Sequence, residues 1–146
     1  MTTHEQAVSV VQQFFATLEA MDMEPFFALW AADGRQEMPF APRGFPSLLE
    51  GIDAVRRQYG GLPDAYGRMV FPGLVVRPLE EPGWVFAEYS GQIELLNGGV
   101  YNNSYCGLFH VENGRIVLFR EYFNPIILQQ SFGGSLGSTF NVEEHS

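Results

Sequence analysis

Carboxylates are the acid and base groups that this sequence offers, because the other common catalytic side chains are scarce. All eight basic residues among the 146 are Arg, and the lack of Lys excludes Schiff-base chemistry and the Lys of a phosphate-binding loop. Cys106 is the single cysteine, and two of the three His stand near the ends of the chain. There are too few Cys and His residues for a Cys-rich zinc site, and hardly enough for a His metal cluster or a serine-hydrolase triad. No metal or other cofactor is therefore expected.

Glu121 is the carboxylate whose surroundings favour chemistry. It alternates with Phe119 and Phe123 in a segment rich in β-branched and aromatic residues. A carboxyl group in an apolar cavity has its charged form disfavoured, so its pKa should rise towards neutrality, where it can move a proton at a carbon next to a carbonyl. The alternative is a structural carboxylate that hydrogen-bonds to the backbone at the end of the sheet.

Two Asn-Gly pairs predict the turns that connect the last strands. The three strands in question are residues 84–96, 100–112 and 115–123. A two-residue turn at Asn113-Gly114 pairs Cys106 with Glu121. The same kind of turn at Asn97-Gly98 pairs Tyr89 with Cys106, although the Gly that follows would also permit a longer, bulged turn.

Directly opposed residues share a face of a sheet, so these pairings give each strand an inward and an outward face. The predicted inward face consists of Val85, Ala87, Tyr89, Gly91, Ile93, Asn102, Ser104, Cys106, Leu108, His110, Val117, Phe119, Glu121 and Phe123. The opposite face then carries Tyr105, Phe109, Leu118 and Tyr122, an apolar patch that suggests a homodimer through the outer sheet face. The same register predicts an outer ion pair between Glu88 and Arg120, across Gly107.

Tyr89 and Glu37 are the other catalytic candidates. The Tyr89 hydroxyl, with Asn102 or Ser104, could donate to a developing enolate oxygen. Glu37, on a strand predicted at 35–40, could supply a second carboxyl, whose repulsion with Glu121 would hold one of the two protonated. Glu37 is alternatively an exposed strand-edge residue or the partner of a nearby Arg, and Tyr89 is alternatively a core aromatic.

The ligand-binding candidates are the side chains expected to line the same cavity. They are Trp30, Asn102, Ser104, Cys106, His110, Phe119 and Phe123. Three of them have other interpretations: His110 as a core histidine, Cys106 as a small buried hydrophobe, and Trp30 as part of the core.

The remaining elements are helices and short strands. Apolar residues at helical spacing predict helices at 4–21, 24–32 and 48–59, and further strands are expected at 35–40 and 69–77. Asn124-Pro125 is a good helix start, so residues 126–132 should form a short helix. The chain is thus a single α+β domain over residues 1–132. A Gly- and Ser-rich tail follows over 133–146 and stays flexible unless Leu136 and Phe140 dock.

Charge and hydropathy exclude several classes of partner. The formal net charge is -9 and the Arg residues form no cluster, so neither nucleic acid nor an anionic membrane surface is expected as a partner. No apolar run approaches the length that spans a bilayer. Residues Met1 to Gln6 do not have the pattern of a targeting signal, so a cytoplasmic location is expected.

Several motifs are similar to those of a known family. They are Leu62-Pro63-Asp64, Tyr101-Asn102-Asn103-Ser104-Tyr105, Glu112-Asn113-Gly114-Arg115-Ile116 and Arg120-Glu121-Tyr122-Phe123-Asn124-Pro125-Ile126. These segments resemble the PhzA/PhzB phenazine-biosynthesis proteins, which belong with the SnoaL-like proteins to the nuclear transport factor 2 and ketosteroid isomerase superfamily. The resemblance implies a cone of N-terminal helices packed on a strongly bent antiparallel sheet. It also implies an acid/base role for Glu121.

A weaker resemblance is to limonene epoxide hydrolase, through Gln36-Glu37-Met38-Pro39 and Arg120-Glu121-Tyr122-Phe123. It places Arg35 and Glu37 at that family's first pair of catalytic positions and Glu121 at the last. Tyr89 and Gly91 stand where the family carries Arg and Asp, so epoxide hydrolysis is not implied here. The segment from 69 to 74 also lacks the pocket His of the PhzA/PhzB proteins.

Together these features predict a cofactor-independent acid/base enzyme of the isomerase, cyclase or dehydratase type. Its substrate would be a hydrophobic, carbonyl-bearing small molecule held in an enclosed pocket. The alternative is a non-catalytic protein that binds a small molecule on the same fold. The volume of the cavity and the separation of Glu37 from Glu121 discriminate between these possibilities.

Overall fold

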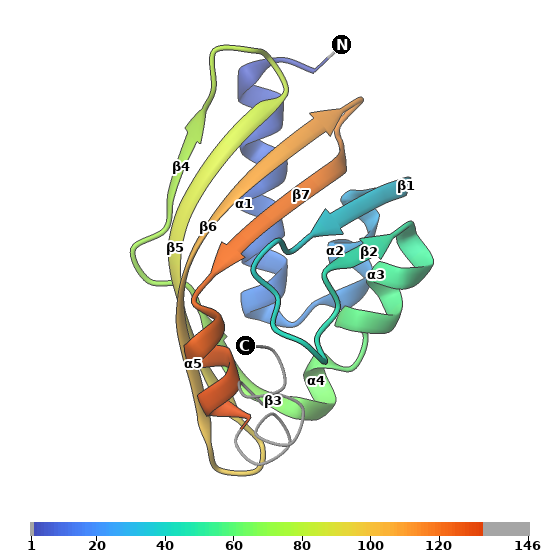
Figure 1. Cartoon of the computed structure of the whole chain (residues 1–146). Coiled ribbons are helices and arrows are strands. Elements are labelled where there is room, and N and C mark those ends of the chain that lie inside the picture. The colour runs from blue at the N-terminus through green and yellow to red at the C-terminus, as the bar shows by residue number, and fades with distance from the viewer. Residues whose placement is uncertain (1, 133–146) are drawn as a thin grey trace.

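The computed structural model describes residues 2–132, and the predicted tail over 133–146 lies outside the described residues. The fold is α+β, as predicted: helix α1 (His4–Ala20) lies across the concave side of a curved sheet, with the other helices near one end of it (Figure 1). No helix of the described residues is long and apolar enough to cross a membrane.

Helix α1 has the start and the buried face that its sequence predicts. Thr3 caps it in a reciprocal capping box with Gln6, and Met21 ends it in the left-handed conformation. Its buried residues are Ala7, Val10, Val11, Phe14, Phe15 and Leu18. Because these side chains recur at helical spacing, α1 presents one continuous apolar face to the sheet.

The shorter helices differ in part from the prediction. Helix α2 (Met23–Ala28) ends before residue 32, because strand β1 already begins at Trp30. The predicted helix at 48–59 is a short strand, β2 (Leu48–Glu50), followed by α3 (Ile52–Tyr59), since Gly51 with a φ of 85° separates the two. Helix α4 (Leu62–Ala65) precedes the sheet, and α5 (Pro125–Ser131) is capped by Asn124 as expected.

The sheet has the strand order β2-β1-β7-β6-β5-β3, and β4 also pairs with β5. Strand β1 (Trp30–Glu37) runs parallel to β7 (Arg115–Phe123), whereas the other pairs are antiparallel. The strand predicted at 69–77 is two strands, β3 (Tyr66–Val70) and β4 (Val75–Pro78), because Pro72 and Gly73 interrupt the pairing. Strands β5 (Trp84–Leu95) and β6 (Val100–Glu112) complete it.

The register between β6 and β7 follows the prediction only next to the turn. Asn113 and Gly114 both have positive φ, as a two-residue turn of this type requires, and Glu112 pairs with Arg115. A bulge then shifts the pairing by one residue, so that Cys106 lies opposite Tyr122 rather than Glu121.

The hairpin between β5 and β6 is also one residue away from the prediction. Residues 95–99 form a longer turn in which the Leu95 amide donates to the Gly99 carbonyl oxygen at 2.8 Å, and Glu94 pairs with Val100. Tyr89 therefore pairs with Tyr105 instead of Cys106.

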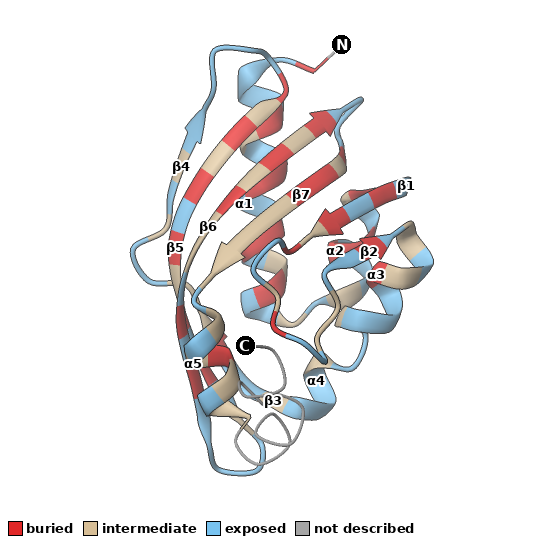
Figure 2. Ribbon diagram, viewed as in Figure 1, coloured by how far each residue is buried: buried red, intermediate tan, exposed pale blue. Residues whose placement is uncertain are grey.

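The predicted register is wrong by one residue both between β5 and β6 and between β6 and β7, and this affects the strands differently. The two errors leave the predicted inward faces of β5 and of the C-terminal part of β7 correct, but they turn β6 over. Its inward side carries Tyr101, Asn103, Tyr105, Gly107, Phe109 and Val111. The predicted placement of Asn102, Ser104, Cys106, Leu108 and His110 on the inward face is therefore wrong. Figure 2 shows buried and less buried positions alternating along β5, as expected for a strand with one face on the core.

The core between α1 and the sheet is built from aromatic rings. Phe109 and Phe119 are a stacked cross-strand pair with ring centroids 4.2 Å apart, and Phe14 of α1 meets both rings edge-on. Gly107 makes room for this stack, because a Cβ there would lie 2.6 Å from the Phe119 ring.

Candidate active site

A cavity of about 430 Å³ lies between the concave face of the sheet and the helices that cover it. Its walls are mainly apolar and come from α1, α5 and the inward faces of the strands, with five tyrosines among them. Among the described residues that line it, Glu121 is the single carboxylate, and there is no Arg, Lys or His. A cavity of this size and polarity is typical of a site for a small hydrophobic molecule.

Glu121 enters the cavity from the inward face of β7. It lies opposite Gly107 on β6, which in turn pairs with Ala87 on β5. The Phe119 ring fills the space above Gly107, so the aromatic core borders Glu121 on this side. The sequence placed Glu121 correctly on this face.

Two side chains donate hydrogen bonds to the Glu121 carboxyl group. The Tyr89 hydroxyl donates to Oε2 at 2.5 Å, and Gln36 Nε2 lies 3.4 Å from Oε1. The Gln36 amide is oriented in turn by Tyr59, whose hydroxyl donates to Gln36 Oε1 at 2.7 Å. Each carboxyl oxygen therefore faces one donor, and neither donor is charged.

The surroundings of Glu121 raise its proton affinity. Burial raises the pKa of this carboxyl group to about 7, against an opposing but smaller effect of the hydrogen bond from Tyr89. Burial and the nearby Glu121 charge also raise the pKa of Tyr89 well above its usual range. Near neutral pH the carboxyl group can thus both accept and release a proton, while Tyr89 keeps its own.

The predicted aromatic residues are divided between cavity and core. Phe123 lines the cavity near Glu121. Phe119 is fully buried beneath Phe14 and does not line it, and Trp30 is part of the same core, with 2% of its surface exposed. Of the aromatic candidates on the β7 face, Phe123 is therefore the one placed to touch a ligand.

The four polar candidates on β6 lie on the far side of the sheet from the cavity. Asn102, Ser104, Cys106 and His110 alternate with the inward residues and point outward. His110 stacks on Trp84 with ring centroids 4.1 Å apart. Because a strand alternates its side chains, the register shift that moves Tyr105 inward moves these residues out.

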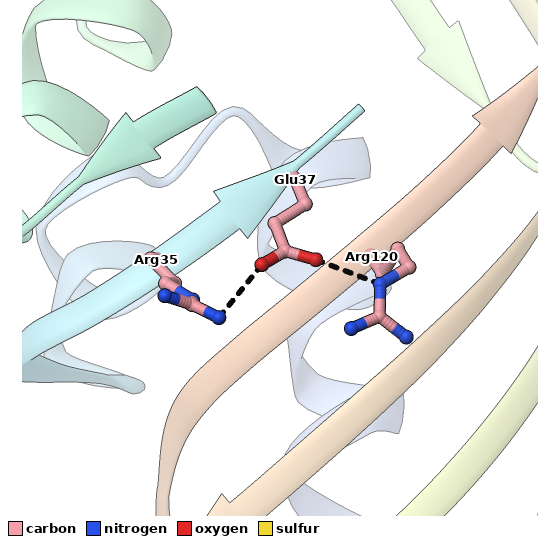
Figure 3. Close-up of polar contacts among 3 residues, drawn as sticks. All are labelled: Arg35, Glu37 and Arg120. Atoms are coloured by element: carbon pink, nitrogen blue, oxygen red, sulfur yellow. Dashed lines mark hydrogen bonds and ion pairs between the residues drawn. The ribbon is translucent and has the colours of Figure 1, made fainter. Parts of the chain in front are cut away.

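Glu37 also faces away from the cavity, which corrects the prediction of a second catalytic carboxyl. Its Oε2 lies 2.8 Å from Nη2 of Arg35, and its Oε1 accepts a hydrogen bond from Nε of Arg120 at 2.7 Å (Figure 3). Arg120 thus pairs with Glu37, and the predicted pairing of Arg120 with Glu88 across Gly107 is wrong, since Gly107 faces inward. The two Arg side chains hold Glu37 on the outer face.

Sequence reasoning missed Gln36, Tyr59, Tyr101 and Tyr105 as cavity residues. A signal for Gln36 was present, because Gly34, Gln36 and Met38 alternate with the charged Arg35 and Glu37, and charged residues mark the solvent face of a strand. No comparable signal existed for Tyr59, which reaches the site from the end of α3. The described residues also contain no group of three His, Cys, Asp or Glu side chains that could hold a metal ion.

The chain matches the family model of the SnoaL-like domain over residues 11–119, and it belongs to that family. The YesE protein of Bacillus subtilis is 29% identical over 140 residues, which are 95% of each chain. The PhzA/B-like protein PA3332 of Pseudomonas aeruginosa is 24% identical over 118 residues, 80% of this chain and 83% of that protein. The resemblance to PhzA/B-like proteins is thus confirmed.

Solved structures share the fold over nearly the whole chain. A Bacillus subtilis protein to which an isomerase function has been ascribed superposes with a TM-score of 0.83 at 29% identity, covering 92% of this chain and 97% of that one. The LEH-like epoxide hydrolase of M. tuberculosis has a TM-score of 0.69 at 19% identity, covering 91% and 94%. Solved NTF2-like proteins have the same architecture, so the predicted fold class is confirmed.

Proposed function

We propose that this protein is a cofactor-independent acid/base enzyme of the isomerase, cyclase or dehydratase type, and that Glu121 is its proton-transfer group. The observation that carries the proposal is a carboxyl group with a pKa of about 7 inside an apolar cavity. A general acid or base works best when its pKa lies near the operating pH, and such a group contributes about 10² to 10⁴ in rate.

In the proposed reaction Glu121 removes a proton from a carbon next to a substrate carbonyl. The electron pair of the broken C–H bond moves into the carbonyl group and gives an enolate, and Glu121 then returns the proton to another atom of the substrate. Tyr89 donates to the carboxylate before the transfer. Once Glu121 is protonated it is a weaker acceptor, so the Tyr89 hydroxyl is free to donate to the enolate oxygen instead.

The walls of the cavity favour an uncharged substrate. The described lining residues include no cation that would pair with a carboxylate or phosphate group, and an anionic ligand would be repelled by the Glu121 charge. Apolar walls of this extent match a molecule with a hydrophobic carbon skeleton and few polar atoms. We therefore propose a neutral, hydrophobic, carbonyl-bearing substrate.

Proton exchange on a model ketone tests the proposal. 2-Tetralone is neutral and hydrophobic and has exchangeable protons next to its carbonyl, and NMR in D₂O follows their replacement by deuterium. We expect the native protein to accelerate exchange and Glu121→Gln to lose about 10² to 10⁴ of that acceleration. Glu37→Gln is the matched control, because Glu37 lies on the outer face of the sheet.

The same experiment separates the enzyme from the non-catalytic binding protein. A native protein that binds the ketone without accelerating its exchange would support the binding protein and contradict the enzyme. Equal acceleration by the native protein and Glu121→Gln would show that another group transfers the proton.

The homodimer stays a proposal, on a corrected patch. Tyr105 and Phe109 face inward, so they cannot belong to an outer interface. The outer face of the sheet instead carries Phe86, Leu108 and Tyr122. Sedimentation velocity of the native protein and of Leu108→Asp tests this patch, and the native dimer should become a monomer in the variant because a buried unpaired charge opposes association.

A further inference from the structure

A second polar group lies in the cavity on β6, apart from the Glu121 carboxyl group. Tyr101 pairs with Ile93 of β5, whereas Glu121 lies at the level of Ala87, so the two residues enter the cavity at different levels along the long strands. Tyr101 lines the cavity and has only 6% of its surface exposed. A buried hydroxyl needs hydrogen-bond partners, and the partners of Tyr101 determine what it can offer a ligand.

Asn103 fixes the direction of the hydrogen bond on the Tyr101 oxygen. Its Oδ1 accepts from the backbone amides of Ser104 at 2.8 Å and Asn124 at 3.2 Å. Only the carbonyl oxygen of the side-chain amide can accept these bonds, so Nδ2 must be the atom on the other side. Nδ2 donates to the Asn124 carbonyl oxygen at 3.0 Å and to the Tyr101 hydroxyl oxygen at 2.9 Å.

Tyr105 supplies a second neighbour to the same hydroxyl. Its ring lies over Gly91, where a Cβ would come within 2.9 Å, and it therefore reaches along β6 towards Tyr101. Burial is the main cause that raises the pKa of both Tyr101 and Tyr105, so both hydroxyls keep their protons near neutral pH.

Among the described residues, nothing accepts the Tyr101 proton. Asn103 donates to the Tyr101 oxygen, and among residues 2–132 there is no hydrogen bond in which the Tyr101 hydroxyl is the donor. A hydroxyl that accepts a hydrogen bond still has its own proton to donate. The open direction is the cavity that Tyr101 lines.

We propose that the Tyr101 hydroxyl is a hydrogen-bond donor to an oxygen of the ligand, and that Asn103 is the residue that positions it for this role. The ligand then carries an acceptor oxygen, such as a carbonyl or ether oxygen, at a distance from the carbon that faces Glu121. This subsite rests on the proposed function only in taking the cavity as the ligand site. The subsite narrows the proposed class of substrate to neutral molecules that carry an acceptor oxygen away from the reacting carbon, where Tyr101 can donate to it.

A matched pair of small molecules tests this subsite. 9-Fluorenone and fluorene have the same planar three-ring skeleton and differ in one carbonyl oxygen. Binding is measured by calorimetry at pH 8.5, where Glu121 is ionised and holds the Tyr89 donor, so that Tyr89 does not compete with Tyr101 for the ketone oxygen. For each protein variant we take the ratio of the fluorenone affinity to the fluorene affinity. The two probes differ in their solvation by water, but this difference is the same for every variant and cancels when the ratios are compared.

We expect Tyr101→Phe to lower the preference for fluorenone over fluorene by about threefold to tenfold, the value of one neutral hydrogen bond. Tyr66→Phe is the matched control, since Tyr66 lines the same cavity but is not held by an amide, and it should leave the ratio unchanged. Tyr105→Phe should also keep the preference, because Tyr101 retains its proton.

Three results would overturn the proposal. They are an unchanged ratio in Tyr101→Phe, loss of the preference in Tyr105→Phe but not in Tyr101→Phe, and failure of the native protein to bind either compound up to its solubility. The assay measures binding and not proton exchange. A protein that keeps the Tyr101-dependent preference but does not exchange tetralone protons would refute the enzyme and leave the subsite intact.

Discussion

Replacing Tyr89 by Phe should raise the pKa of Glu121 above its value of about 7. The substitution removes the hydroxyl that donates to Glu121 Oε2 at 2.5 Å. It keeps the ring, which packs against Phe15 at 4.6 Å and Tyr105 at 5.0 Å, so the walls of the cavity are retained. A hydrogen bond to a charged group is worth about 1.5–3 kcal/mol, and about 1.4 kcal/mol corresponds to one pKa unit. The expected rise is therefore about one to two units.

The titration can be followed directly by carbon-detected NMR on protein labelled at the glutamate side-chain carboxyl carbon. Glu121→Gln identifies the signal, and Tyr66→Phe serves as a control that removes a hydroxyl from the same cavity without removing a bond to Glu121. A Glu121 pKa that stays at its native value or falls in Tyr89→Phe would refute the role of this hydrogen bond. A native pKa near that of a free glutamate would refute the burial argument as a whole.

Three further predictions concern stability and the faces of the sheet. Glu121→Gln should remove most of the loss of stability that the native protein shows between pH 4.5 and about 7, measured by urea unfolding across this range. Gly107→Ala should cost about 1–3 kcal/mol because its methyl group would meet the Phe119 ring at 2.6 Å, whereas Gly61→Ala, with open space around its Cβ, should change stability by less than about 0.5 kcal/mol. Glu37→Gln should leave the Glu121 pKa unchanged in the NMR titration and cost about 1 kcal/mol or less, since its partners Arg35 and Arg120 are partly exposed.

Most of the elements around the site could be predicted because local chemistry determines them. The apolar spacing of α1, the positive φ values at Asn113 and Gly114, and the Asn124-Pro125 start of α5 all depend on residues close together in the sequence. Strand β1 was placed a few residues late, because Trp30 continues the apolar pattern of the preceding helix. There the burial of a large ring in the core outweighs local propensity.

The sequence does not determine which face of β6 is buried, because polar and apolar residues are mixed on both faces of this strand. Each face mixes polar and apolar residues: one carries Tyr101, Asn103 and Tyr105, and the other carries Asn102, Ser104 and Cys106. A one-residue change in either hairpin exchanges them. The bulge between His110 and Val111 and the long turn at residues 95–99 are each such a change. Glu121 kept its predicted face because the two changes cancel between β5 and β7.

The choice between Gln36 and Glu37 shows how charge can mislead a search for catalytic groups. Glu37 is predicted to be a second catalytic group because it is a carboxylate, yet two Arg side chains hold it on the outer face. Gln36, with 1% of its surface exposed, occupies the inward position. An uncharged amide is less costly to bury than a carboxylate, and here its oxygen and nitrogen are used by Tyr59 and Glu121.

The interactions of Glu121 argue against the alternative of a structural carboxylate. A structural carboxylate is stabilised in its charged form by a cation or by backbone amides, which lower its pKa. Glu121 has neither among the described residues, and its pKa is raised from 4.5 to about 7. A carboxyl group with a raised pKa contributes its full stability below the unfolded pKa and loses it as the pH rises to the folded value, so this difference corresponds to a cost of up to about 3 kcal/mol above pH 7. A carboxyl group that lacks such partners and lines a cavity supports the proposal that Glu121 transfers protons.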